Sequence, residues 1–71
     1  MTNIYNLFMD YQNLLKRIRD ALLVSQADLA KILNVTFATV NRWENGEFKP
    51  TMKMRRKLAP LFKEHGIVVE E

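Results

Sequence analysis

Apolar side chains recur at helical spacing through the first third of the chain. Positions 11, 14, 15, 18 and 22 are apolar, while Lys16, Arg17 and Asp20 fall between them. Steps of three and four residues place the apolar positions on one face of a helix. The apolar positions 4, 7 and 8 continue the same stripe backwards. We therefore expect this helix either to begin near Asn3 or to fray over residues 1–10.

Two shorter helices are predicted next, and each opens at a residue type that caps helices. Ser25 and Thr36 offer a hydroxyl oxygen to a backbone N–H that has no helical partner, and an acid three residues after Ser25 forms a weak capping box. Apolar positions 29, 30 and 33, and then 40 and 43, form the inward faces. Asn34 and residues 45–46 (Asn-Gly) are expected to end the two helices, because both residue types tolerate positive φ.

A fourth helix is predicted from about Thr51, with apolar positions 54, 58, 61 and 62 on one face. Pro60 falls inside this pattern and cannot donate a backbone hydrogen bond to Arg56. We therefore expect a kink at this point or a break into two short helices. Gly66 is a suitable residue to end the helix.

The length and composition limit the possible architectures. A chain of 71 residues suffices for one domain, and the absence of cysteine excludes disulfides and thiolate metal sites. No apolar run approaches the roughly 18 residues of a membrane span, so a cytoplasmic protein is expected. The pattern predicts a single all-α domain of four to five helices over residues 1–71. Its core is expected at 11–65, with an N-terminal helix extension or tail at 1–10 and a C-terminal tail at 67–71.

The positive charge of the chain is concentrated in two places. The formal net charge is +3, and no acid occurs between Glu47 and Glu64 although six basic residues do. Lys16, Arg17 and Arg19 form a second cluster. Such clusters suit a surface that faces phosphates, but a solvated helix face has the same composition.

The two short helices are joined by a loop of about three residues, 34–36. This loop is too short to let the helices pack side by side in antiparallel fashion, and it favours the wide angle of a helix-turn-helix unit. Ala30 suits that geometry, because a small side chain lets the next helix cross closely.

Several runs around this unit are distinctive. They are residues 25–30 (Ser-Gln-Ala-Asp-Leu-Ala), 33–36 (Leu-Asn-Val-Thr), 39–46 (Thr-Val-Asn-Arg-Trp-Glu-Asn-Gly) and 49–50 (Lys-Pro). Through them, residues 14–62 resemble the lambda-repressor-like, or XRE/Cro, family of helix-turn-helix DNA-binding proteins. The chain departs from the family where glycine is common, at Leu23 and Asn34, and at Pro60. Leu23 predicts a different local path at the end of the first helix.

The resemblance implies sequence-specific binding of double-stranded DNA by a transcriptional regulator of prokaryotic or phage type. With Val40 and Trp43 turned inward, the third helix would present its outward residues to the major groove. The candidate base-reading residues are Phe37, Ala38, Asn41 and Arg42. The alternatives are that Phe37 belongs to the core and that Arg42 touches phosphate.

The resemblance also assigns contacts to the DNA backbone. The N-terminus of the second helix would meet a phosphate, with Gln26 adding a hydrogen bond. The full set of candidate phosphate-binding residues is Gln26, Thr36, Thr39, Asn45 and Lys49. By the same resemblance, Arg19 and Glu44 are expected to form a structural ion pair. For Gln26 the alternative is an exposed residue in the first turn of its helix.

A second hypothesis is a protein-interaction module, such as the antitoxin of a toxin–antitoxin pair. Its partner would bind the N-terminal stripe (Ile4, Leu7, Phe8) or the C-terminal patch (Ile67, Val68, Val69). Many relatives in the lambda-repressor-like family bind DNA as two-fold dimers, so the resemblance predicts a homodimer. An enzyme is not expected, because the chain lacks a glycine-rich phosphate loop and has a single histidine, His65. No metal, catalytic site or cofactor is predicted.

Overall fold

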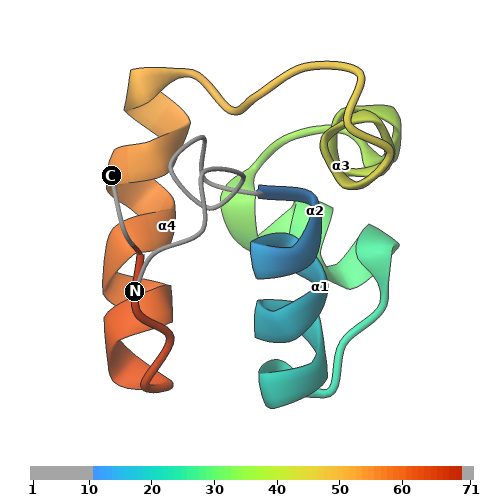
Figure 1. Ribbon diagram of the computed structural model, residues 1–71. Coiled ribbons are helices and arrows are strands. Elements are labelled where there is room, and N and C mark those ends of the chain that lie inside the picture. Colours follow the sequence, from blue (N-terminus) through green and yellow to red (C-terminus); the bar gives the residue numbers. More distant parts are fainter. Residues whose placement is uncertain (1–10, 70–71) are drawn as a thin grey trace.

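The computed structural model describes residues 11–69, and this part of the chain contains four helices and no strand. The helices are α1 (Tyr11–Leu22), α2 (Gln26–Leu33), α3 (Phe37–Glu44) and α4 (Met52–Glu64). Figure 1 shows α3 almost end-on while α1 and α4 stand upright, so α3 crosses them at a wide angle. The all-α architecture expected from the sequence is confirmed. The N-terminal helix extension expected at 1–10 lies outside the described residues.

Side-chain caps start three of the helices, and the sequence predicts two of these caps, Ser25 and Thr36. Ser25 Oγ accepts a hydrogen bond from the N–H of Asp28, and the Asp28 carboxylate accepts one from the N–H of Ser25, which completes the capping box. In the same way, the Thr36 hydroxyl accepts from the N–H of Thr39, and the Thr51 hydroxyl accepts from the N–H of Met54. These hydroxyls satisfy backbone donors that have no helical partner. The helix starts are therefore encoded locally.

The core lies between α1, α2 and α3 and is closed on one side by α4. α3 packs against both α1 and α2, and α4 packs against α2. Val40 and Trp43 point into this core and are almost completely buried, as the sequence predicts. The loop between α2 and α3 is short because Asn34 takes the left-handed conformation at φ 59° and ψ 47°, which turns the chain at once. Together α2 and α3 form the expected helix-turn-helix unit.

The end of α1 differs from the expectation. Leu23 adopts φ 59°, in the left-handed region that favours glycine. The backbone N–H of Val24 donates to the carbonyl of Arg19, which closes the final turn of the helix. The different local path expected from Leu23 is therefore wrong. Leu23 is 90% exposed, so the chain keeps a strained backbone here without burying the side chain.

The fourth helix also differs from the expectation. α4 runs without a break from Met52 to Glu64 with Pro60 inside it, so the predicted break is wrong. Pro60 and Arg56 are both exposed, so the Arg56 carbonyl that loses its helical donor can be solvated. Leu58 and Phe62 flank the proline and are fully buried. Their packing anchors the residues before and after Pro60 in the core, so the helix continues across the proline.

The C-terminal segment contributes to the core. Ile67 is buried and Val69 packs partly against the core, whereas Val68 is exposed. The N–H of Ile67 donates to the carbonyl of Phe62, and Gly66 takes φ 68°. Ile67 therefore belongs to the core, contrary to the expected tail beginning at 67. Among the described residues, no helix has the length and apolar content needed to cross a membrane.

Candidate DNA-binding surface

The outer face of α3 is open to solvent. Ala38 and Arg42 are exposed, and Phe37 is 54% exposed even though it is a large apolar side chain. Val40 and Trp43 lie on the opposite face and anchor the helix in the core. The structure therefore places three of the four candidate base-reading residues on one exposed ridge. Phe37 is not a core residue.

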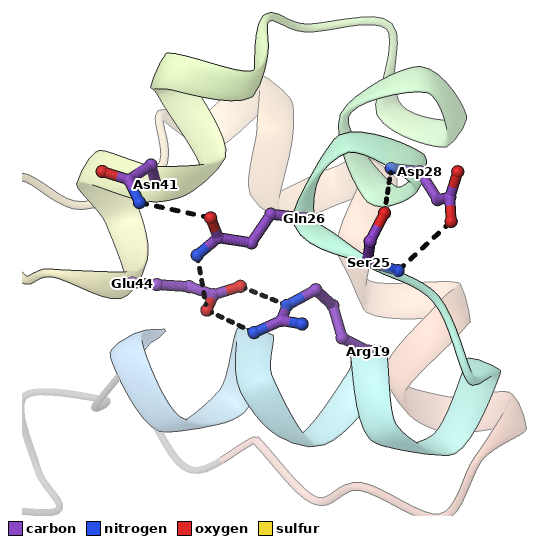
Figure 2. Close-up of polar contacts among 6 residues, drawn as sticks. All are labelled: Arg19, Ser25, Gln26, Asp28, Asn41 and Glu44. Atoms are coloured by element: carbon purple, nitrogen blue, oxygen red, sulfur yellow. Dashed lines mark hydrogen bonds and ion pairs between the residues drawn. The ribbon is translucent and has the colours of Figure 1, made fainter.

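Beneath this ridge, Arg19 of α1 and Glu44 of α3 form a two-point ion pair. Arg19 Nε lies 2.6 Å from Glu44 Oε2, and Nη2 lies 2.8 Å from Oε1. The Glu44 side chain is only 2% exposed and that of Arg19 is 22% exposed. Paired donors and a planar carboxylate give this contact a defined geometry. The pair fastens the C-terminal end of α3 to α1 (Figure 2).

The protonation of Glu44 follows from these contacts. Burial by itself would raise the pKa of Glu44, but hydrogen bonds from Arg19 and Gln26, with the charges of Arg19 and Lys16, outweigh burial and hold the pKa below its usual value. The hydrogen bond between Arg19 and Glu44 also raises the pKa of Arg19, so it favours the charged form of both partners. The buried carboxylate is therefore ionised at neutral pH, and it can only accept hydrogen bonds.

Gln26 lies between this carboxylate and the ridge. Its Nε2 donates to Glu44 Oε1 at 3.0 Å, and its Oε1 accepts from Asn41 Nδ2 at 3.2 Å (Figure 2). Asn41 is half-buried, and its Oδ1 accepts from Asn45 Nδ2 at 3.0 Å. We call the series Arg19, Glu44, Gln26, Asn41 and Asn45 the polar chain. The resemblance had predicted only its first link, between Arg19 and Glu44. The contacts of Gln26 were not predicted, although the spacing of positions 41 and 45 was a local signal for the last link.

The remaining phosphate candidates lie at the two ends of α3. Thr36 and Thr39 are adjacent at its N-terminus, where their hydroxyl oxygens are 2.9 Å apart and Thr36 also accepts from the N–H of Thr39. Asn45 and Lys49 lie past the other end, and both are exposed. The structure thus brings Thr36 and Thr39 together and places Asn45 and Lys49 past the opposite end of α3. It does not bring all five together.

Several basic residues have structural contacts that the sequence did not predict. Lys57 Nζ donates to the carbonyl of Leu33 at 3.3 Å, which caps the C-terminus of α2 from α4. Arg55 Nε donates to the carbonyl of Pro50 at 2.9 Å, and its guanidinium lies 5.7 Å from the centre of the Tyr11 ring. The exposed Arg42 and Glu47 approach to 3.8 Å. Part of the positive charge therefore stabilises the fold.

A comparison with known families now bears on this geometry. A helix-turn-helix family model matches residues 15–63, which is more than half of the chain. No curated protein and no solved structure matches the chain significantly. The matched span contains the capped α2–α3 unit, the ion pair and most of α4. The family comprises DNA-binding regulatory domains and is not an enzyme family. The chain therefore belongs to the helix-turn-helix family of lambda-repressor-like, XRE/Cro type.

Proposed function

We propose that this protein binds double-stranded DNA in a sequence-specific manner and regulates transcription, with α3 entering the major groove. The observation that carries the proposal is the exposed ridge of Phe37, Ala38 and Arg42 above the buried Val40 and Trp43. The major groove is wide enough for a helix and displays a distinct pattern of donors and acceptors for each base pair. An exposed helix on a rigid base suits that groove.

The side chains of the ridge offer complementary chemistry. Arg42 can donate two hydrogen bonds to guanine O6 and N7, or it can bind phosphate, and Phe37 and Ala38 can contact thymine methyl groups. The 3.8 Å approach of Arg42 to Glu47 is solvent-exposed, so it holds the guanidinium only weakly. Phe37 is exposed in the first turn of α3, and a thymine methyl would give this side chain an apolar contact.

The flanks of the ridge suit the DNA backbone. The capped N-termini of α2 and α3 present backbone N–H groups beside Gln26, Thr36 and Thr39, and Lys49 adds a positive charge beyond α3. Phosphate contacts of this kind set the position of a protein on the duplex without reading sequence. We therefore propose that these residues position α3. Because helix-turn-helix proteins commonly bind two half-sites as two-fold dimers, we also propose that the protein binds a two-fold site as a homodimer.

Selection of bound sites from a random DNA pool tests the proposed function. We expect one enriched motif, repeated with two-fold symmetry about one helical turn apart if two copies bind. An Arg42→Ala variant should bind this site about 5- to 100-fold more weakly and lose preference at one base pair. Lys63→Ala is the matched control, because it removes the same charge near the far end of α4. A pool that yields no enriched motif would contradict base reading.

A further inference from the structure

The donor and acceptor order of the polar chain is set by its buried end. The ionised Glu44 carboxylate can only accept, so the Gln26 nitrogen must face it, at 3.0 Å. The Gln26 oxygen then faces Asn41, and it requires a donor there. The Asn41 nitrogen occupies that place at 3.2 Å, which leaves the Asn41 oxygen to accept from Asn45 at 3.0 Å.

Reversing any amide of this series would bring like groups together. If the Asn41 amide turned over, its oxygen would face the Gln26 oxygen. If Gln26 turned over in response, its oxygen would face the Glu44 carboxylate, which is only 2% exposed, so solvent can do little to relieve the repulsion. One orientation of Asn41 is therefore strongly preferred, although the side chain is only half-buried.

We propose that Gln26 is a positioning residue for base recognition. Its nitrogen must donate to the Glu44 carboxylate, so its oxygen must accept from Asn41, and this holds the Asn41 amide in one orientation. This inference rests on the proposed function. After its two internal contacts, Asn41 retains one N–H and one acceptor lone pair for a base. A freely turning amide could offer these groups in either order, whereas the held amide offers one order.

The proposal separates Gln26 from a simple phosphate contact. A residue that binds only phosphate contributes equally to all DNA sequences, whereas a residue that orients Asn41 contributes to the choice of one base pair. The discriminating quantity is the ratio of affinities for sites that differ at one base pair. This ratio does not depend on the fraction of protein that is folded, so a destabilised variant remains informative.

The test uses the full chain and five proteins: wild type, Gln26→Met, Asn41→Ala, the double variant and Gln12→Met. Methionine retains the length of glutamine and removes its hydrogen bonds. Gln12→Met is the matched control, because Gln12 Nε2 donates to the backbone carbonyl of Glu44 at 3.4 Å and lies outside the polar chain. Each protein is titrated against the selected site and its single-base-pair variants.

Asn41→Ala first identifies the base pair that Asn41 reads. We expect Gln26→Met to lower discrimination at that same base pair at least about fivefold, to preserve discrimination at the base pair that depends on Arg42, and to add nothing in the Asn41→Ala background. Gln12→Met should leave every ratio unchanged. A uniform loss of affinity in Gln26→Met would overturn the inference, and so would unaltered preferences in Asn41→Ala. A wild-type protein without any preferred site would instead overturn the proposed function.

Discussion

At the scale of single residues, Glu44 combines two roles. Its carboxylate accepts two hydrogen bonds from Arg19 and one from Gln26, and its backbone belongs to the last turn of α3. A buried charge is stable only when its partners remain in place. Loss of either partner therefore disturbs both the attachment of α3 to α1 and the amide that supports Asn41.

Removal of Arg19 should destabilise the protein strongly. Arg19→Met leaves the Glu44 carboxylate buried with Gln26 as its remaining side-chain donor, and we expect a loss of about 2–4 kcal/mol in the free energy of unfolding. This loss is smaller than the largest losses seen for fully buried ion pairs, because the Arg19 side chain is 22% exposed. Urea denaturation at pH 7 measures the loss. Arg17→Met removes an exposed charge from the same helix and should change stability by less than about 0.5 kcal/mol.

The same carboxylate predicts how stability depends on pH. The pKa of Glu44 is lowered in the folded protein, so its contribution is complete above the unfolded value of about 4.3 and is lost as the pH falls through the folded pKa. The stability difference between wild type and Glu44→Gln should therefore shrink on acidification below about pH 4. Asp28, whose pKa is lowered by hydrogen bonds from Ser25, is common to both proteins and cancels. A difference that stays constant down to pH 2 would contradict this assignment.

At the scale of the elements, helix ends decide the geometry of the DNA-facing unit. Asn34 and Gly46 take positive φ where α2 and α3 end, and the residue types suit that conformation. A Cβ atom at Gly46 would lie 2.7 Å from the end of the exposed Gln12 side chain, which can move away, so the positive φ of 79° is what favours glycine. Leu23 is the exception, because its branched side chain is strained at φ 59° and gains nothing from burial.

Replacement of Leu23 by glycine should therefore stabilise the protein. Glycine relieves the left-handed strain but increases the entropy of the unfolded chain, so we expect a net gain of about 0.5–1 kcal/mol. Thermal unfolding should show a higher midpoint. The control is Ala21→Gly, an exposed position inside α1 where glycine should lower stability by about 0.5–1 kcal/mol. Equal effects of the two substitutions would show that strain at Leu23 is negligible.

At the scale of the whole molecule, charge and shape act together. α3 projects its ridge from a base formed by α1 and α2, while basic residues of α4 are divided between internal contacts and solvent. The proposed phosphate contacts come from the flanks of α3, and the proposed base contacts come from its outer face. Affinity that comes from the flanks should depend on salt, whereas the preference among sequences should not.

A salt titration of DNA binding tests this division. The logarithm of the affinity should fall linearly with the logarithm of salt concentration, and Lys49→Ala should reduce the slope by about one while weakening all sequences alike. Lys63→Ala, which removes a charge near the end of α4, should leave the slope unchanged. A Lys49→Ala variant that alters the preferred base sequence would contradict a phosphate role for Lys49.

Much of the fold was predictable because its signals are local. The hydroxyls of Ser25 and Thr36, the left-handed Asn34 and the apolar pair Val40 and Trp43 each act within a few residues of the chain. Pro60 and Leu23 misled the prediction because the same local rules lack any information on solvation and packing. The folded molecule decides whether the Arg56 carbonyl, which Pro60 leaves without a donor, reaches water. It also decides whether other interactions outweigh the backbone strain at Leu23.

The candidate site was predictable to a smaller extent. Helical periodicity placed Phe37, Ala38 and Arg42 on the outer face, and the structure shows them exposed. The links from Gln26 to Glu44 and to Asn41 span 18 and 15 residues, and neither spacing carries a signal in a single sequence. Asn41 was expected to be as open as its neighbours, and the structure instead shows it half-buried and hydrogen-bonded on both sides.

The sequence by itself determined where α2 and α3 begin and end and which face of each helix is apolar, because caps and periodicity act over one or two turns. Only the tertiary structure decided that Gln26 joins Glu44 to Asn41, since these hydrogen bonds depend on how three helices cross. The ionised Glu44 carboxylate at that crossing requires hydrogen-bond donors around it. This requirement fixes the orientation of the Gln26 amide and, through it, of the Asn41 amide beside the exposed ridge.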